Sequence, residues 1–256
     1  MMDMILTAWA AVSFLMFVLW LIHLPLKNAS IVDAGWAAGI ALCASIFTYL
    51  GQGNAQRRIL LTAMICFWGL RLAVHLLFDR IIGQPEEGRY VELREKWKTN
   101  ISLKFLGFYQ LQALTCVMLA TPFFLASRDN RSLGFTDWLG LAIWIAGLCG
   151  ESIADAQLKR FKANAENRGL SCRAGLWNYS RHPNYFFEWL TWVGYATIAM
   201  PSEWGAVGLL APAMILFLLL RVTGIPATEQ HAVKSRRDYK EYQATTSAFV
   251  PWFKKA

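Results

Sequence analysis

The chain has 256 residues, of which 56% are hydrophobic, 14% aromatic and only 16% charged. That is far more apolar surface than a water-soluble core of this length needs, so the composition favours an integral membrane protein. The formal net charge of +8 could suit nucleic acid, but the basic residues lie in the segments between apolar runs, without a basic arm or repeat. We therefore expect membrane lipids as its surroundings and no nucleic-acid partner.

Apolar runs of about 20 residues, long enough to cross a bilayer, recur along the whole sequence. They predict an all-α, polytopic membrane protein with about seven transmembrane helices, forming a single integral membrane domain. The apolar N-terminus lacks the basic start and the cleavage site of a signal peptide, so we expect it to be retained as the first helix. The expected spans are residues 4–24, 31–50, 57–78, 103–126, 136–156, 184–200 and 204–224.

The polar connections predict the orientation in the membrane. Residues 79–102, residues 157–183 and the tail from residue 225 are long and polar, and two spans separate each from the next, so they share one side. Most lysines and arginines lie on that side, which places it in the cytoplasm and the N-terminus outside. A multi-pass protein of the bacterial inner membrane, with its active site facing the cytoplasm, is the expected localisation. The opposite side has only Arg57, Arg58, Arg128 and Arg131.

The five cysteines have no metal-ligand spacing, and four of them fall within apolar runs. We interpret them as small core residues and expect neither a metal site nor disulfide bonds. They are Cys43, Cys66, Cys116, Cys149 and Cys172.

A polar cluster precedes the sixth expected span. Arg181, His182, Asn184 and Glu188 lie around Pro183, which suits the first position of a helix because its missing N–H is not needed there. The cluster would then lie at a helix N-terminus, where backbone donors and the helix dipole favour phosphate or carboxylate groups. The alternative is an interfacial cap that only satisfies the end of the helix.

These residues carry a resemblance to a known family. Residues 176–185, Leu-Trp-Asn-Tyr-Ser-Arg-His-Pro-Asn-Tyr, resemble the signature of the membrane reductases related to steroid 5-alpha-reductase, and more closely the bacterial branch DUF1295. The similarity continues through Gly224, Pro226 and Glu229 to a close at residues 246–252. Isoprenylcysteine carboxyl methyltransferases carry a similar Arg-His-Pro-x-Tyr element but bind S-adenosylmethionine. The motif therefore indicates the superfamily better than the reaction.

The resemblance implies NADPH as the cofactor. In the steroid reductases an Asn and an Asp at the spacing of Glu151 and Asp155 help to bind the dinucleotide, and Lys162 falls where the family has an arginine near the phosphates. Glu151 replaces the Asn and keeps an acceptor for a hydrogen bond. Gly224 and Pro226 are expected to break the last span and turn the tail back toward the cluster. The other expected cofactor-binding residues are Arg89, Arg94, Arg181, His182, Asn184, Tyr185, Glu188, Arg221, Glu229, Tyr239 and Tyr242.

Asp33 is the candidate catalytic acid. It lies near the start of the second span, and the steroid reductases are thought to use a glutamate on their second span to polarise a substrate carbonyl. A short helix starting near Glu87 would bring Tyr90 onto a face with the arginines beside it, and Tyr90 or Trp68 would assist Asp33. The alternatives are a structural ion pair between Asp33 and Arg71, and a helix-start residue favoured by the dipole.

The leading hypothesis is an NADPH-dependent reductase of an activated carbon–carbon double bond, of the enone type, in a steroid-like or other lipid-soluble substrate. Residues 1–126 would form the substrate half and residues 127–256 the cofactor half. A second hypothesis is a membrane methyltransferase that uses S-adenosylmethionine. A scaffold or transporter is the non-enzymatic alternative, and it is disfavoured because the polar groups gather at one face and form no path across the bilayer.

Overall fold

The computed structural model describes residues 1–222 and 224–254, with the backbone alone at residues 79 and 80. Over these residues the regular structure is helical apart from one isolated bridge between Ser180 and Ser247. Six helical stretches are long and apolar enough to cross a membrane, which makes this an integral, multi-pass membrane protein. They are Met2–Leu26, Ile31–Leu50, Ala55–Leu76, Ile101–Leu119, Phe135–Ala163 and Gly205–Ser235.

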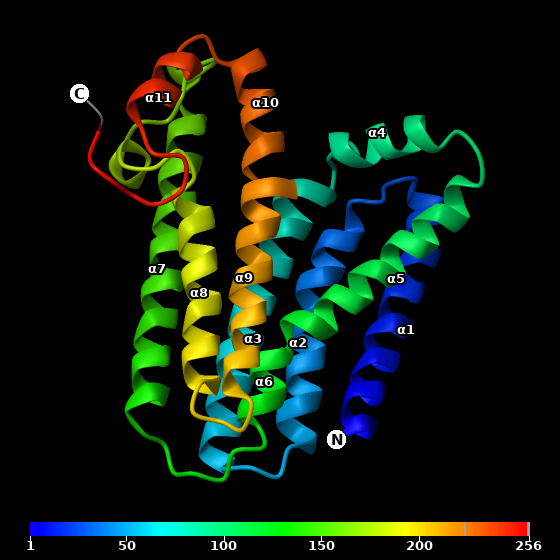
Figure 1. The fold of residues 1–256 in the computed structure, drawn as a ribbon. Coiled ribbons are helices and arrows are strands. Elements are labelled where there is room, and N and C mark those ends of the chain that lie inside the picture. The colour runs from blue at the N-terminus through cyan, green and yellow to red at the C-terminus, as the bar shows by residue number, and fades with distance from the viewer. Residues whose placement is uncertain (223, 255–256) are drawn as a thin grey trace. The chain divides into compact units, whose positions relative to one another are not determined.

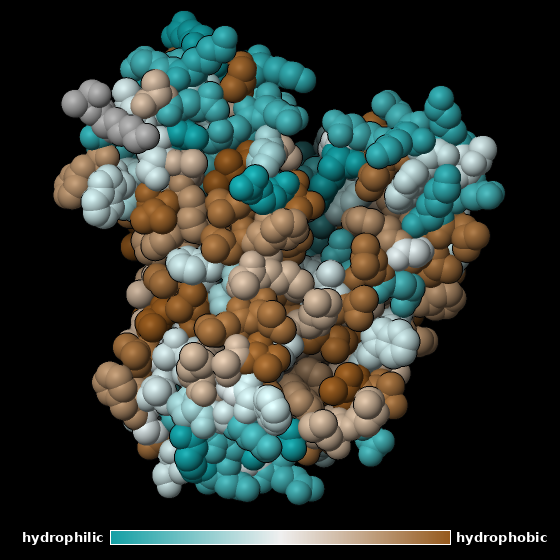
Figure 2. Space-filling model, viewed as in Figure 1, coloured by the Kyte–Doolittle hydropathy of each residue, from teal (hydrophilic) through white to brown (hydrophobic). Residues whose placement is uncertain are grey.

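The chain divides into two compact units (Figure 1). Unit 1 comprises Met1–Leu133 and Pro201–Val207, and unit 2 comprises Gly134–Met200 and Gly208–Ala256. On the face shown in Figure 2, apolar side chains cover the middle of each unit and hydrophilic ones gather toward its ends. Large apolar side chains such as Phe14, 69% exposed, are therefore placed to face lipid.

Unit 1 packs four long helices through small residues. A methyl group on Gly39 would lie 2.8 Å from Val12 Cγ2 and 3.1 Å from Cys116 Sγ, so this glycine lets α2 approach α1 and α5 closely. The expected span 103–126 is divided at Ala120, between α5 and α6. The elements are α1 (Met2–Leu26), α2 (Ile31–Leu50), α3 (Ala55–Leu76), the π-helical η1 (Leu77–Ile81), α4 (Gly88–Trp97), α5 (Ile101–Leu119) and α6 (Thr121–Ala126).

Unit 2 is organised around the antiparallel pair α7 and α8. A methyl group on Gly140 would lie 2.7 Å from the carbonyl oxygen of Gly194, and the reverse distance is also 2.7 Å, so the two backbones are nearly in contact. The elements are α7 (Phe135–Ala163), η2 (Ala165–Asn167), η3 (Gly175–Asn178), α8 (Pro183–Ala199), η4 (Gly205–Leu209, which begins in unit 1), α9 (Leu210–Phe217), the π-helical η5 (Leu218–Val222), α10 (Ile225–Ser235) and α11 (Tyr239–Thr245).

The fifth predicted span is shorter than the helix that forms, whereas the sixth has the length of its helix. The fifth, expected over residues 136–156, continues to Ala163 as α7, so Lys159 and Lys162 lie on a helix and not in a loop. At 29 residues α7 is roughly 44 Å long, more than the 30 Å or so of a bilayer core, and its charged last turns can extend into water. The sixth expected span is α8, which has 17 residues and is near the lower limit for crossing.

The sequence suggested that the chain turns back at Gly224 after the last apolar stretch, but it does not. Instead α10 continues in the direction of α9 (Figure 1). Pro226 lies in the first turn of α10, where a missing N–H is tolerated, so it starts this helix without reversing the chain. The chain reverses after Ser235, and α11 then leads the tail back to the beginning of α8.

Candidate functional site

In unit 1 the beginning of α2 is held by the segment that leads into α4. Glu86 accepts a hydrogen bond from the backbone N–H of Ala29 at 2.6 Å, and Ser30 Oγ accepts one from the N–H of Glu87 at 2.9 Å. Arg94 Nε and Nη2 donate to the two oxygens of Glu86 at 2.8 and 3.0 Å. This bidentate pair fixes the segment before α4, so the first turn of α4 lies over Asp33.

Asp33 binds two side chains from that turn. The hydroxyl of Tyr90 donates to one carboxylate oxygen at 2.7 Å, and the guanidinium of Arg89 forms an ion pair with the other. The short helix predicted near Glu87 is therefore confirmed as α4, and it brings Arg89 and Tyr90 to the same carboxylate. We call Asp33, Arg89 and Tyr90 the acid triad.

The acid triad is only partly buried. Tyr90 is fully buried, whereas the Arg89 side chain is 36% exposed and that of Asp33 is 19% exposed. Burial, with the negative charge of Asp33, raises the pKa of Tyr90 well above its usual 10.0, so the hydroxyl keeps its proton at neutral pH. A protonated phenol beside a carboxylate is a hydrogen-bond donor suited to an oxygen on which negative charge develops.

The expected partner of Asp33, Arg71, needs correction, and the expected role of Trp68 stays a prediction. The arginine paired with Asp33 is Arg89, where the sequence had suggested Arg71. Arg71 lies inside α3, whereas Arg89 lies on α4. The contact between Arg89 and Asp33 therefore depends on how the loop before α4 folds. Trp68 is fully buried in α3, and the side-chain partners of Asp33 are Arg89 and Tyr90.

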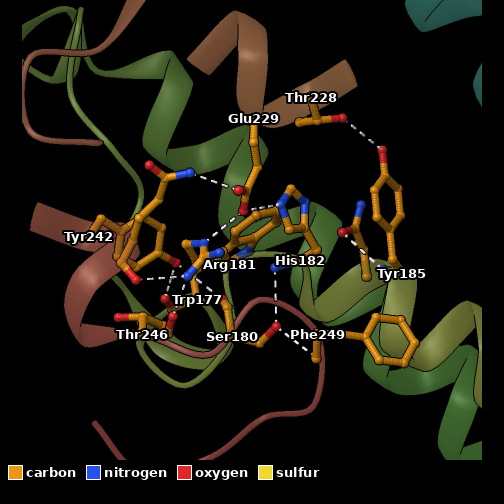
Figure 3. Close-up of polar contacts among 12 residues, drawn as sticks. Trp177, Ser180, Arg181, His182, Tyr185, Thr228, Glu229, Tyr242, Thr246 and Phe249 are labelled. Atoms are coloured by element: carbon orange, nitrogen blue, oxygen red, sulfur yellow. Dashed lines mark hydrogen bonds and ion pairs between the residues drawn. The ribbon is translucent and has the colours of Figure 1, made fainter. Parts of the chain in front are cut away.

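In unit 2 the beginning of α8 is bound to the end of the chain (Figure 3). The N–H of Arg181 donates to the carbonyl of Ser247 at 2.8 Å, and Ser180 Oγ donates to that of Phe249 at 2.8 Å. The N–H of Trp252 donates to the carbonyl of Tyr179 at 3.0 Å. We call residues 246–252 the C-terminal strap.

The side chain of Arg181 holds the strap and α10 together. Its Nε donates to Glu229 at 2.7 Å, and its Nη1 donates to the carbonyl oxygens of Gln243 and Thr246. Gln243 in turn donates to the other oxygen of Glu229 at 2.7 Å. With its side chain 10% exposed, Arg181 is a buried clasp, whereas the sequence suggested an arginine that faces a phosphate.

His182 lies beside this clasp. Its Nε2 is 3.2 Å from Glu229 Oε1, and its ring stacks on Tyr185 with centroids 5.3 Å apart. Burial lowers the pKa of His182 below 6.5, despite the opposing effect of Glu229. The imidazole is therefore neutral at pH 7, and Tyr185 extends the cluster to the hydroxyl of Thr228 at 3.2 Å.

A second polar contact joins α7 to α8. Asn184 Nδ2 donates to Asp155 Oδ1 at 3.1 Å, so two predicted cofactor residues meet. Glu188 accepts from Trp192 Nε1 one turn along α8, at 2.9 Å. Pro183 is the first residue of α8, as expected, and this contact lies in the first turn of the helix.

The remaining predicted cofactor residues separate into three groups. Tyr239 and Tyr242 are buried on α11, where burial raises the pKa of both, and Tyr242 donates to the carbonyls of Trp177 and Ser180. Glu151 is buried in α7, one turn before Asp155, and Lys162 is exposed near the end of that helix. Arg221 is exposed in η5 and makes no interaction with the clasp among the described residues.

Sequence reasoning missed several residues that build these sites. Glu86 organises the acid triad, and the Pro-Glu-Glu-Gly run before α4 could have marked it as a helix-entry segment. Thr228 follows Pro226 in the first turn of α10, but nothing in the sequence marks its contact with Tyr185. Gln243 gave no local signal, because its role depends on the path of the strap.

Comparison with known proteins gives a family but no activity. The chain matches the family described as "Protein of unknown function (DUF1295)" over residues 19–246. It is also similar to an uncharacterized protein of Schizosaccharomyces pombe, with 26% identity across 91% of this chain and 76% of that protein. No solved structure matches. The match over most of its length shows that this chain belongs to the DUF1295 family.

Proposed function

We propose that this protein is a membrane-embedded, NADPH-dependent reductase of an activated C=C bond in a lipid-soluble enone. The observation that best supports the proposal is the 2.7 Å hydrogen bond from Tyr90 to Asp33, with Arg89 on the second carboxylate oxygen. A buried phenol that keeps its proton, held by a charged carboxylate at the start of a membrane-spanning helix, suits activation of a carbonyl in an apolar substrate.

The triad divides the chemistry among its members. Tyr90 turns its O–H from Asp33 to the substrate carbonyl and donates a hydrogen bond as negative charge develops on that oxygen. Asp33 orients the phenol through one carboxylate oxygen, and Arg89 pairs with the other. When bound, NADPH supplies the hydride for the β-carbon. The α-carbon then takes a proton from water, which completes a saturated ketone.

Unit 2 has side chains that fit a dinucleotide. The Asp155–Asn184 pair offers carboxylate and amide groups that suit ribose hydroxyls, and Tyr185 and Thr228 add two further hydroxyls. Lys162, exposed near the end of α7, supplies a positive charge for a phosphate. Arg181 would act indirectly, by holding the strap and α10 in place.

Paired variants in purified, detergent-solubilised protein test the roles of the two units. Oxidation of NADPH is followed by the absorbance of this cofactor at 340 nm, with a panel of α,β-unsaturated ketone lipids as substrates. We expect Tyr90→Phe to lower kcat by about 10²- to 10³-fold, because it removes the hydrogen-bond donor to the substrate carbonyl, and to leave the Kd for NADPH unchanged. Asn184→Ala should raise the Kd for NADPH instead.

Tyr109→Phe is the matched control. Tyr109 is also fully buried in unit 1, but its hydroxyl donates to the carbonyl of Ala29 at 3.1 Å and not to Asp33. Its turnover should remain within about threefold of wild type, since only a structural hydrogen bond is lost. Equal losses in Tyr90→Phe and Tyr109→Phe would remove the special role of the triad.

A comparison of cofactors tests the proposal at its base. We expect NADPH to raise the Tm of the purified protein and S-adenosylmethionine to leave it unchanged, because a ligand that binds the native state stabilises it. Stabilisation by S-adenosylmethionine alone, with no oxidation of NADPH by any enone lipid, would replace the reductase with a methyltransferase.

A further inference from the structure

Unit 2 has a cavity whose lining is cationic. It has a volume of about 520 Å³ and lies beside the last turns of α7. Three basic side chains line it, Lys162, Arg168 and Arg236, and no acidic side chain of the described residues does so. Leu158 and Phe161 supply an apolar wall. This volume is within the usual range of 300 to 1,000 Å³ or so for small-molecule sites.

Hydrogen bonds hold the walls of the cavity in place. The N–H of Arg237 donates to the carbonyl of Gly169 at 3.2 Å, and Ser171 donates twice to Asp238, at 2.9 Å from its N–H and 2.7 Å from its Oγ. Asn167 Nδ2 donates to the carbonyl of Phe161 at 2.8 Å. The loop after α7 is therefore tied both to its own helix and to the segment before α11.

The carboxylate of Asp238, which is held by the loop beside the cavity, is engaged elsewhere. Asp238 accepts from Ser171 and lies 3.5 Å from Arg173, which also pairs with Glu241. The position of Lys162 in the last turn of α7 is explained by the helix dipole, which favours a cation there. Arg168 follows only the three-residue η2, so no long helix end accounts for its charge. Arg236 is the C-cap residue of α10, and its guanidinium lies over the ring of Tyr239, 5.8 Å from the ring centroid. Among the described cations of the lining, Arg168 is therefore the one whose placement points most directly to an anionic ligand.

We propose that this cavity binds the phosphate group of an organic phosphate ester, with the ester's less polar part against Leu158 and Phe161. Two guanidinium groups and an ammonium provide charge and forked donors suited to a phosphate. The cavity lies where α7 and α10 end, and both belong to stretches that can cross a membrane. Phospholipid head groups and soluble nucleotides are both available at such an end. Lys162 is shared with the dinucleotide-binding residues proposed above, whereas Arg168 and Arg236 are not, so a variant of these two arginines tests this cavity separately from the reduction.

The variant Arg168→Gln/Arg236→Gln tests the proposal in the full-length protein. It removes both guanidinium groups while keeping much of the length of the two side chains. The control, Lys159→Gln/Arg160→Gln, removes the same charge from exposed α7 residues outside the lining. In neutral detergent, AMP and adenosine are titrated calorimetrically. In a second arm, the protein is reconstituted in nanodiscs of mixed phosphatidylglycerol and phosphatidylcholine, and the lipid retained after extraction is identified by native mass spectrometry.

We expect the cavity variant to weaken phosphate binding at least tenfold and the control to change it by less than twofold. Loss of AMP binding, with adenosine bound weakly by all proteins, identifies a soluble phosphate ester. Selective loss of retained phosphatidylglycerol identifies a phospholipid head group. Lys162→Gln serves as a second variant if the double variant has a lowered Tm. The proposal is overturned if neither arm distinguishes the cavity variants from the control.

Discussion

Each unit contains an arginine–carboxylate pair at the start of a helix, and the two pairs differ in what else they hold. In unit 1, Arg89 and Asp33 share the carboxylate with the hydroxyl of Tyr90, and Arg89 is 36% exposed. In unit 2, Arg181 and Glu229 are 10% and 15% exposed, and Arg181 also donates to two backbone carbonyls. The first pair lies beside a phenol hydroxyl and is partly exposed, whereas the second is saturated by the protein. Similar residue types therefore suit chemistry in one unit and structural support in the other.

Removing the carboxylate of the clasp should have the largest effect on stability. Glu229→Ala leaves Arg181 buried without its carboxylate and also removes partners of His182 and Gln243. We expect the free energy of unfolding to fall by about 3 to 5 kcal/mol. Tryptophan fluorescence during thermal unfolding in detergent measures the change.

The control for this prediction is Glu241→Ala. Glu241 is an exposed carboxylate on α11 that pairs with Arg173 at the surface. Its loss should leave the Tm close to that of wild type, because water replaces the partner. If both variants have the same Tm, Arg181 and Glu229 are not a buried clasp.

Removing the arginine of the acid triad should have a smaller effect on stability. In Arg89→Ala, the hydroxyl of Tyr90 still donates to Asp33, and water can approach the vacated oxygen because both side chains are partly exposed. We expect a loss of about 1 to 2 kcal/mol in the free energy of unfolding. Arg89→Lys should recover part of it by keeping the charge. A loss in Arg89→Ala as large as that in Glu229→Ala would erase the difference between the two pairs.

Acidification should have the smallest effect, and it should act on the clasp. Because burial lowers the pKa of His182 below 6.5, the unfolded chain binds a proton at a higher pH than the native protein does. Stability therefore falls as the pH drops below 6.5, by at most about 1.4 kcal/mol per pH unit from this group. Well above pH 6.5 both states are neutral, and the contribution vanishes.

The variant His182→Gln isolates this contribution. Glutamine can donate to Glu229 but does not titrate, so we expect the decline in Tm between pH 6.5 and 5.5 to be shallower than in wild type. Parallel pH profiles for the variant and the wild type would assign the acid sensitivity to other groups.

Much of the fold could be predicted because it depends on local properties of the chain. Apolar runs of membrane-spanning length predict where the long helices form, and Pro183 and the segment near Glu87 predict where two others begin. The extension of α7 to Ala163 was missed because its last turns are charged, and charged turns are interpreted as loops when only hydropathy is used. The division between α5 and α6 at Ala120 likewise lies inside a continuous apolar run.

The sequence by itself determined the all-helical membrane architecture and the residue types available for chemistry, because hydropathy and helix signals act over a few turns. Only the tertiary structure decided that Arg89, not Arg71, pairs with Asp33, and that Arg181 binds Glu229 and the strap. These partners are 48 to 65 residues apart in the chain. Which of several arginines reaches a given carboxylate depends on how the loops and the tail fold back, and no local pattern encodes that path.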